Sequence, residues 1–277
     1  HRGHQKILQK LVREAKRLNR KSLVITFHPH PRKVANPRSK IPFLTSLDHR
    51  FRLIEAIGID YFFVIRFTRS ILRMTADDFI KNILMKRFRM KALVVGKDFL
   101  FGYKGRGDLK FLKRASKELN FKLFSVPQVK VKQKIVSSTE IRKKIEKGDL
   151  NNAALMLGRP VTVLGTVVRG KEIGRKIGFP TANIDPHHEA IPPTGVYAVG
   201  LKMGKKIFKG VLNIGLRPTF ESNKDNSIEL HIIDFKKNLY GRDIEVIFKR
   251  KIRNERKFSS IQGLRAQIKR DIQIAKQ

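Results

Sequence analysis

The hydrophobic pattern of the chain changes near residues 157–160, and this change limits the folds it can adopt. Before it, apolar runs typical of strands, such as residues 23–27 and 91–96, alternate with stretches of helical period, such as residues 3–19. This alternation predicts a parallel, doubly wound α/β sheet of the Rossmann type. After it, short β segments lie between Gly, Pro and Asn turns, which predicts a small all-β barrel.

We therefore expect two domains, residues 1–157 and residues 158–277, with an amphipathic helix over 258–276 closing the second. In the first domain, further helices are expected at 47–57, 75–87, 107–119, 138–147 and 150–157, and further strands at 61–67 and 121–126. In the second, strands are expected at 161–169, 195–201, 206–211, 227–235 and 243–251.

Composition restricts the class of protein. Hydrophobic residues make up 41% of the 277 positions, enough for two cores. No apolar run approaches the length that spans a bilayer, and no secretory leader is visible. Cysteine is absent, so the sequence offers neither disulfides nor thiolate metal ligands. We expect a cytoplasmic protein without a membrane partner.

The chain is strongly basic, with 61 Lys and Arg residues against 23 acids and a formal net charge of +38. Such an excess is typical of proteins that bind nucleic acid. Here the basic residues are spread along the chain and no recognition motif accompanies them, which favours a solvated basic surface. Binding of nucleic acid stays open as an alternative function. A basic field would also attract ligands that carry phosphates.

The segment Gly-Phe-Pro-Thr-Ala-Asn at 178–183 has the composition of a ligand-binding loop. Gly178 permits a close backbone approach, and Pro180 fixes the direction of the chain. Thr181 and Asn183 lie two residues apart, so in an extended segment both side chains point to the same side. Their neutral oxygens suit Mg²⁺, which brings phosphates with it. The alternative is a plain turn that enters a β-strand.

This segment resembles the signature of riboflavin kinases, and other motifs agree with it in order. They are His-Arg-Gly-His at 1–4, Thr-Phe-His-Pro-His-Pro at 26–31, Gly-Lys-Asp-Phe-Leu-Phe-Gly at 96–102, Ser-Ser-Thr-Glu-Ile-Arg at 137–142, Asn-Ile-Gly-Leu-Arg-Pro-Thr-Phe at 213–220, Glu-Leu-His at 229–231, Leu-Tyr-Gly at 239–241 and Arg-Asn-Glu-Arg-Lys-Phe at 253–258. Over nearly its whole length the chain resembles the bacterial bifunctional riboflavin kinase/FMN adenylyltransferases. The resemblance implies a nucleotidylyltransferase domain followed by a riboflavin kinase barrel.

In the first domain, His1 and His4 lie at the start of a helix, where backbone N–H groups favour phosphate. The resemblance implies that these histidines stabilise the α-phosphate of ATP while FMN attacks it, and that Arg142 contacts the triphosphate. Catalysis then consists of positioning and charge stabilisation. For the remaining positions it implies ATP binding by Ser137, Ser138 and Thr139, and flavin binding by Asp98, Phe99 and His28.

In the second domain, the resemblance implies that Glu229 is the base for the 5′-hydroxyl of riboflavin and that Thr181 and Asn183 hold Mg²⁺. No P-loop pattern occurs, so a kinase of the P-loop kind is excluded. The other implied contacts are Gly174, Arg175, Asn183 and Tyr240 for ATP, and Arg217, Arg253 and Phe258 for the flavin.

The expected function is phosphorylation of riboflavin to FMN and adenylylation of FMN to FAD, with ATP in both steps. A riboflavin kinase with an inert N-terminal half is a second alternative. The partners expected are small molecules, and the protein is expected to be a monomer or a weak homo-oligomer. The first strand of the α/β sheet is missing ahead of His1, so we expect a fragment of a longer protein in which FMN formation survives better than FAD formation.

Overall fold

The computed structural model describes the chain except residues 39–41, 171–172, 205, 217–225 and 236. The chain divides into two compact units. Unit 1 contains His1–Ile41 and Arg50–Ser137, and unit 2 contains Pro42–His49 and Ser138–Gln277. The expected domain boundary at residues 157–158 stays a prediction.

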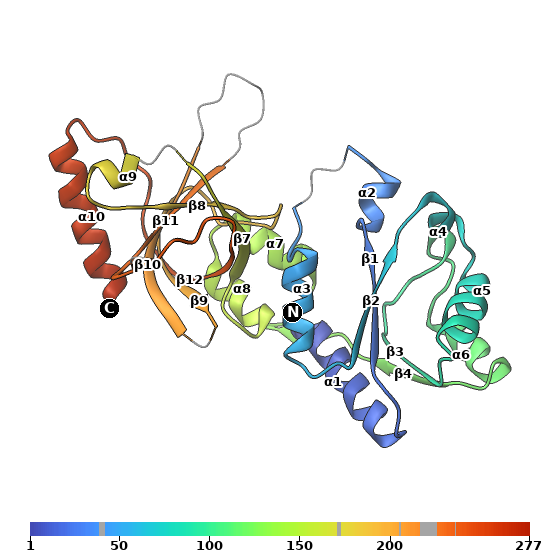
Figure 1. The fold of residues 1–277 in the computed structure, drawn as a ribbon. Helices are drawn as coiled ribbons and strands as arrows, with labels where there is room; N and C mark the ends of the chain where they lie inside the picture. Colours follow the sequence, from blue (N-terminus) through green and yellow to red (C-terminus); the bar gives the residue numbers. More distant parts are fainter. Residues whose placement is uncertain (39–41, 171–172, 205, 217–225, 236) are drawn as a thin grey trace. The chain divides into compact units, whose positions relative to one another are not determined.

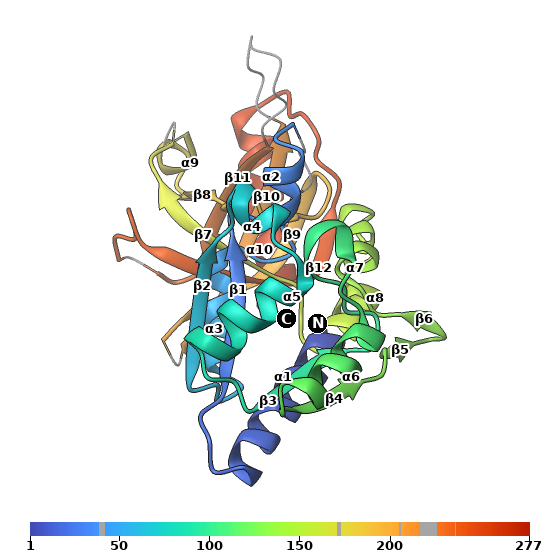
Figure 2. The ribbon, with the colours of Figure 1, turned by 90° about the vertical axis from the view of Figure 1, so that its right-hand side faces the viewer.

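Unit 1 is built on parallel strand pairs. Strand β1 (Leu23–His28) pairs with β2 (Tyr61–Arg66), and β3 (Ala92–Gly96) pairs with β4 (Lys122–Val126), both in parallel (Figure 2). Parallel strands joined through helices confirm the α/β class. The helices before residue 138 are α1 (Arg2–Arg17), α2 (Pro31–Ala35), α3 (Leu47–Glu55), α4 (Arg69–Arg73), α5 (Ala76–Asp78), the π-helix Phe79–Arg87, the 3₁₀ turn Tyr103–Gly105 and α6 (Leu109–Glu118).

Side-chain caps explain where several of these helices begin. The Asp108 carboxylate accepts from the Phe111 N–H at 2.8 Å at the start of α6. The Thr75 hydroxyl accepts from the Asp78 N–H at 3.0 Å and donates to the Asp78 carboxylate at 2.7 Å. These contacts satisfy N–H groups that have no partner within the helix. The helix expected over residues 75–87 therefore begins where it was predicted, with Thr75 as its N-cap.

The core of unit 1 lies between α6, the π-helix and the strands β3 and β4. Its buried members are Ile80, Leu84, Val95, Leu112, Ala115 and Phe121. The continuous apolar run at residues 23–27 is typical of a strand buried on both faces, but the first five residues of β1 are only half-buried and His28 is exposed. Among the described strands β1 pairs with β2 alone, so no second neighbouring strand covers it.

Unit 2 contains a closed β-barrel with the strand order β10-β11-β8-β7-β12-β9, as expected (Figure 1). Closure leaves no strand edge exposed. The strands are β7 (Thr162–Val168), β8 (Ala182–Asp185), β9 (Gly195–Met203), β10 (Lys206–Leu216), β11 (Asn226–Ile232) and β12 (Asp243–Arg253). Two helices, α7 (Ser138–Glu146) and α8 (Leu150–Leu157), precede the barrel and belong to the same unit.

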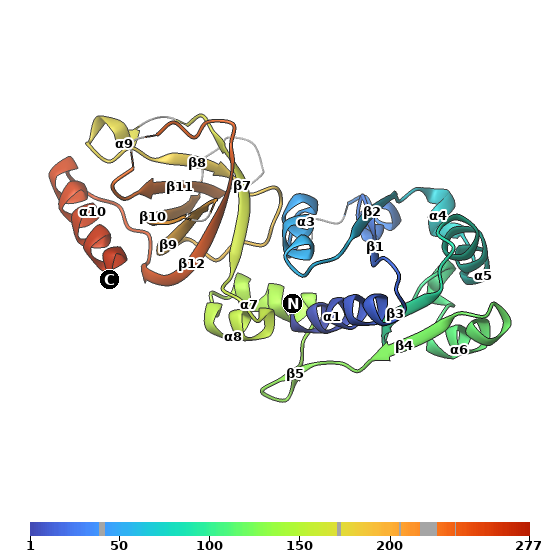
Figure 3. The same ribbon diagram turned by 60° about the horizontal axis from the view of Figure 1, so that its bottom comes forward.

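The terminal helix α10 (Ile261–Lys276) packs along the barrel, on the side formed by β9 and β10 (Figure 3). The Ser260 hydroxyl caps it by accepting from the Gly263 N–H at 3.1 Å. Ala275 and Ile272 pack against barrel residues Val196, Ala198, Val211 and Ile233. Full burial of a Val or Ile side chain such as Val196 or Ile233 stabilises the fold by about 1.5–3 kcal/mol, and an alanine methyl group contributes less.

A few short elements were not expected from the sequence. Strands β5 (Lys130–Val131) and β6 (Lys134–Ile135) form a hairpin, and helix α9 (Ile173–Lys176) precedes the Gly178 turn. Such elements are too short to show a hydrophobic period. None of the helices in the described part of the chain combines the length and apolar character that a bilayer crossing needs.

Candidate active sites

Three polar side chains lie in one row across neighbouring barrel strands. In the antiparallel registers, Glu229 of β11 lies directly opposite Asn213 of β10 on one side and Asn183 of β8 on the other. Residues directly opposite each other in such pairs project from the same face of the sheet. Asn183 is buried and Glu229 is half-buried. The fold thus places a carboxylate between two amides.

Two glycines make room for the metal-site candidates. A Cβ atom on Gly170 would overlap the Asn183 carboxamide. A Cβ on Gly174 would lie 2.5 Å from the Phe179 carbonyl oxygen and 3.0 Å from Thr181 Oγ1. Only residues without a side chain allow this approach. Gly170 therefore lies against Asn183, and Gly174 against Thr181.

The segment that carries these oxygens is fixed against β11. His231 Nδ1 lies 2.9 Å from the Pro180 carbonyl oxygen, and the His231 ring packs edge-on against Phe179 at 5.8 Å. The Ser227 hydroxyl donates to the Glu229 carboxylate at 3.3 Å. The sequence motifs contained these residues except Ser227, but only the folded structure showed that they are neighbours.

The predicted flavin residues Arg253, the last residue of β12, and Phe258, beyond it, make contacts within the protein. The Arg253 guanidinium donates to both oxygens of the buried Asp271 carboxylate on α10, at 2.9–3.1 Å. Its charge also lies 5.7 Å from the centre of the Phe258 ring. A Cβ on Gly215 would come within 2.6 Å of Glu255, so this segment packs on β10 close to Asn213. The flavin contacts of Arg253 and Phe258 stay predictions.

The other candidate residues of the kinase half are Tyr240, Arg175 and Arg217. Tyr240 is 44% exposed, in a turn where its N–H donates to Asn238 Oδ1 at 2.9 Å. Arg175 is exposed in α9. Arg217 lies outside the described residues, so its predicted contact with flavin has no structural account.

In unit 1, the two N-terminal histidines lie side by side. The rings of His1 and His4 stack with their centres 4.0 Å apart, and His1 Nδ1 accepts from the His4 N–H at 3.2 Å. A Cβ on Gly3 would lie 3.9 Å from the Val136 carbonyl oxygen. The histidine motif is therefore close to the residue that precedes Ser137.

The motif Ser-Ser-Thr-Glu-Ile-Arg at 137–142 lies at the start of α7, where a helix was expected. Ser138 and Thr139 lie in the first turn of that helix. Arg142, predicted to contact triphosphate, donates through Nε to the Pro42 carbonyl oxygen at 2.8 Å, within unit 2. This contact joins residues one hundred positions apart, and no sequence pattern pointed to it.

The flavin candidates of unit 1 follow strand ends. Asp98 is exposed after β3 and accepts from Gln128 Nε2 at 3.2 Å. Phe99 is 40% exposed and stacks on Phe101, which packs into the core of unit 1. His28 is exposed at the end of β1. Their roles stay predictions.

Comparisons with known proteins agree with this architecture. The family model for FAD synthetase matches residues 1–140, and that for riboflavin kinase matches residues 157–277. Proteins named bifunctional riboflavin kinase/FMN adenylyltransferase are similar over nearly the whole chain. The one from Buchnera aphidicola subsp. Schizaphis graminum is 39% identical, covering 100% of this chain and 89% of its own. The one from Escherichia coli K12 is 39% identical, covering 98% and 87%.

A solved structure gives the same result for the fold. It is the crystal structure of a protein described as a macrolide-efflux protein from Streptococcus pneumoniae. The TM-score is 0.86 at 27% identity, and the match covers 100% of this chain and 90% of that one. Together with the two family models and the relatives over the full chain, these findings place the protein: it belongs to the family of bifunctional riboflavin kinase/FMN adenylyltransferases.

Proposed function

We propose that the chain makes FAD in two steps. One site transfers the γ-phosphoryl group of ATP to riboflavin and gives FMN, and the other transfers the adenylyl group of a second ATP to FMN and releases pyrophosphate. Both family models and the names of the relatives support the two activities. The observation that carries the kinase step is the row of Asn213, Glu229 and Asn183.

In the kinase step, Glu229 acts as the base. Its carboxylate takes the proton of the riboflavin 5′-hydroxyl as that oxygen attacks the γ-phosphorus, and the bond to the leaving ADP oxygen breaks. A half-buried carboxylate next to two amides suits this role, because the amides can orient it without neutralising it. The Ser227 hydroxyl holds one carboxylate oxygen.

Thr181 Oγ1 and Asn183 Oδ1 would hold Mg²⁺ together with ATP oxygens. The residues fit the ion because both offer neutral oxygens and the glycines at 170 and 174 keep side chains away from them. Bound there, Mg²⁺ would neutralise charge on the phosphates. The remaining residues complete the site: Gly174, Arg175 and Tyr240 contact ATP, and Arg217, Arg253 and Phe258 contact the flavin.

In the adenylyl step, a phosphate oxygen of FMN attacks the α-phosphorus of ATP and pyrophosphate leaves. His1 and His4 stabilise charge on the α-phosphate, and Ser137, Ser138, Thr139 and Arg142 hold the leaving phosphates. Asp98, Phe99 and His28 contact FMN. No covalent bond to the enzyme forms, so the side chains act by position and charge. The stacked histidines at a helix start support this assignment.

The two sites act on small molecules, in the cytoplasm, in a monomer or a weak homo-oligomer. The alternatives are not favoured. A protein that only binds nucleic acid would not need both enzyme modules. A chain with an inert first half would not need the FAD synthetase module that residues 1–140 match.

Two substitutions separate the two activities. Glu229→Gln removes the base and should lower riboflavin phosphorylation by about 10²–10⁴-fold while adenylylation of supplied FMN continues. His4→Gln should lower adenylylation and leave phosphorylation unchanged. Both products are measured by chromatography for each variant, so each activity is the control for the other. Unchanged phosphorylation in Glu229→Gln would remove it as the base.

A further inference from the structure

Residues 42–49, called the strap here, come from the part of the sequence matched by the FAD synthetase model but belong to unit 2. The strap lies against the loop that follows β8. The Phe43 N–H donates to the His188 carbonyl at 2.9 Å, and the Ala190 N–H donates to the Phe43 carbonyl at 2.7 Å. Phe43 thus forms an isolated parallel β-bridge with Glu189 of this loop.

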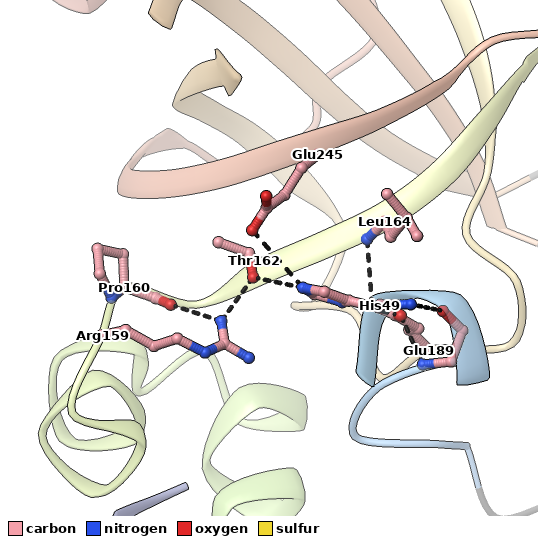
Figure 4. Close-up of polar contacts among 8 residues, drawn as sticks. His49, Arg159, Pro160, Thr162, Leu164, Glu189 and Glu245 are labelled. Atoms are coloured by element: carbon pink, nitrogen blue, oxygen red, sulfur yellow. Dashed lines mark hydrogen bonds and ion pairs between the residues drawn. The ribbon is translucent and has the colours of Figure 1, made fainter. Parts of the chain in front are cut away.

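A buried ion pair fixes the end of the strap (Figure 4). The side chains of His49 and Glu189 are 1% and 0% exposed, and His49 Nδ1 lies 3.0 Å from both Glu189 oxygens. The same carboxylate accepts from the Ser46 N–H at 2.6 Å and from the Leu164 N–H at 3.2 Å. Glu189 therefore joins the strap to β7. A carboxylate buried this deeply requires such partners.

The second nitrogen of the imidazole faces other polar groups. His49 Nε2 lies 3.1 Å from Thr162 Oγ1 and 3.6 Å from the Glu245 carboxylate of β12. Arg159 donates to Thr162 Oγ1 at 2.5 Å. Two carboxylates and two cations then balance one another when His49 is protonated.

We propose that His49 is a positioning residue of the kinase unit, which clamps Glu189 and thereby fixes the chain that leaves β8. The connection to the active site is short. Glu189 lies four residues beyond the end of β8, and β8 carries Asn183 opposite Glu229. The inference rests on the proposed kinase function of unit 2 only for its effect on turnover, because the clamp itself is a property of the fold.

The charges around His49 give the clamp a pH dependence. Burial lowers the pKa of His49, but its hydrogen bonds to Glu189 and Glu245 outweigh this and raise the pKa above 6.5. The other charged groups nearby are Arg159, which faces His49, and Lys202, which faces Glu245. The stabilisation of the fold by protonated His49 is therefore complete at pH values below the pKa that His49 has in the unfolded chain. It is lost as the pH rises through the higher pKa that His49 has in the folded protein.

A double-mutant cycle on the whole chain tests the clamp. We compare the thermal midpoints of the native protein, His49→Gln, Glu189→Gln and the double variant. Each single variant should unfold several degrees lower, since it leaves a buried group without its charged partner. The double variant should lose clearly less than the sum of the two. Additive losses would overturn the clamp.

His188→Asn is the matched control, because His188 is exposed in the same loop and asparagine tolerates its positive φ of 59°. It should keep the native midpoint. Should His49→Gln fail to fold, NMR titration of the native His49 gives a second measurement. An imidazole that titrates at or below 6.5 would contradict the proposal.

The kinase assay tests the positioning role. The native rate of riboflavin phosphorylation should fall with rising pH as His49 deprotonates, and His49→Gln should lose this alkaline decline at a temperature where it is folded. We expect its kcat to fall at least threefold at neutral pH. If the double-mutant cycle shows coupling but His49→Gln keeps the native pH dependence of riboflavin phosphorylation, the positioning role alone is refuted. If the native protein does not phosphorylate riboflavin at all, the proposed function is refuted.

Discussion

At Gly170 the structure leaves no room for a side chain. A methyl group there would overlap the carboxamide of Asn183, which is buried and has little room to move. If Asn183 holds Mg²⁺ as proposed, Gly170→Ala should displace its side-chain oxygen and weaken binding of Mg²⁺ and ATP by roughly 10–100-fold, as loss of support around a metal ligand typically does. The KM for ATP in riboflavin phosphorylation, measured across Mg²⁺ concentrations, checks this.

Gly204 offers the control for this substitution. An added Cβ there meets no atom within 4 Å, although its φ of 59° strains an alanine by about 1–2 kcal/mol. Gly204→Ala should thus lower the free energy of unfolding and leave the KM for ATP unchanged. Equal KM values for the two variants would show that Gly170 does not support the ATP site.

Single residues also mark the limit of sequence reasoning. Thr181 and Asn183 were predicted as neighbours from a spacing of two, a local relation that the backbone enforces. The partners of Arg253 and Arg142 were not predicted, because Asp271 and the Pro42 carbonyl lie far from them in sequence. A motif indicates the type of side chain but not the group that it contacts after folding.

At the scale of elements, one buried ion pair attaches α10 to the barrel. Asp271 is 1% exposed and accepts three hydrogen bonds from Arg253. Asp271→Asn would leave the guanidinium without a counter-charge and should lower the free energy of unfolding by about 3–5 kcal/mol. Urea unfolding measures this loss.

The same helix provides a matched control. Lys276 and Asp234 lie 3.5 Å apart, but both side chains are largely exposed. Asp234→Asn should change stability by less than about 0.5 kcal/mol, because water screens such pairs. A similar loss in both variants would mean that burial does not set the strength of the Arg253–Asp271 pair.

Elements with strong local signals were predicted well. Helix α8 ends at Gly158, which adopts the left-handed conformation that glycine favours, and α10 follows its apolar period. The β5–β6 hairpin was missed because its turn uses Lys132 and Gln133 at positive φ instead of glycine or asparagine. The residues of this turn carry no sequence signal for a hairpin, so only the folded structure reveals it.

For the whole molecule, the sequence predicted the two modules but not the course of the chain between the units. Parallel pairing in unit 1 and barrel closure in unit 2 follow from periodicity. The strap passes into unit 2 and the chain then returns to unit 1 at Arg50, so the chain moves from one unit to the other three times. Hydrophobic period reports which face of an element is buried, and it carries no information on which unit covers that face.

The net charge of +38 is also a property of the whole molecule. The salt dependence of binding can distinguish the proposed enzyme from the alternative, a protein that binds nucleic acid. A solvated basic surface binds any polyanion by releasing counterions, so affinity for a random single-stranded oligonucleotide should fall steeply between about 0.05 and 0.2 M salt. Riboflavin carries no charge, and its binding should change little over this range. Fluorescence anisotropy of the oligonucleotide and flavin fluorescence quenching measure the two.

The decisive comparison is turnover at the higher salt concentration. Phosphorylation of riboflavin should persist there after the oligonucleotide has dissociated. In the proposed kinase site, directed oxygen contacts and Mg²⁺ would hold ATP in addition to the long-range field, which salt screens within about 10 Å. Tight oligonucleotide binding that survives this salt, in a protein that forms no FMN, would instead make nucleic-acid binding the function of the basic surface.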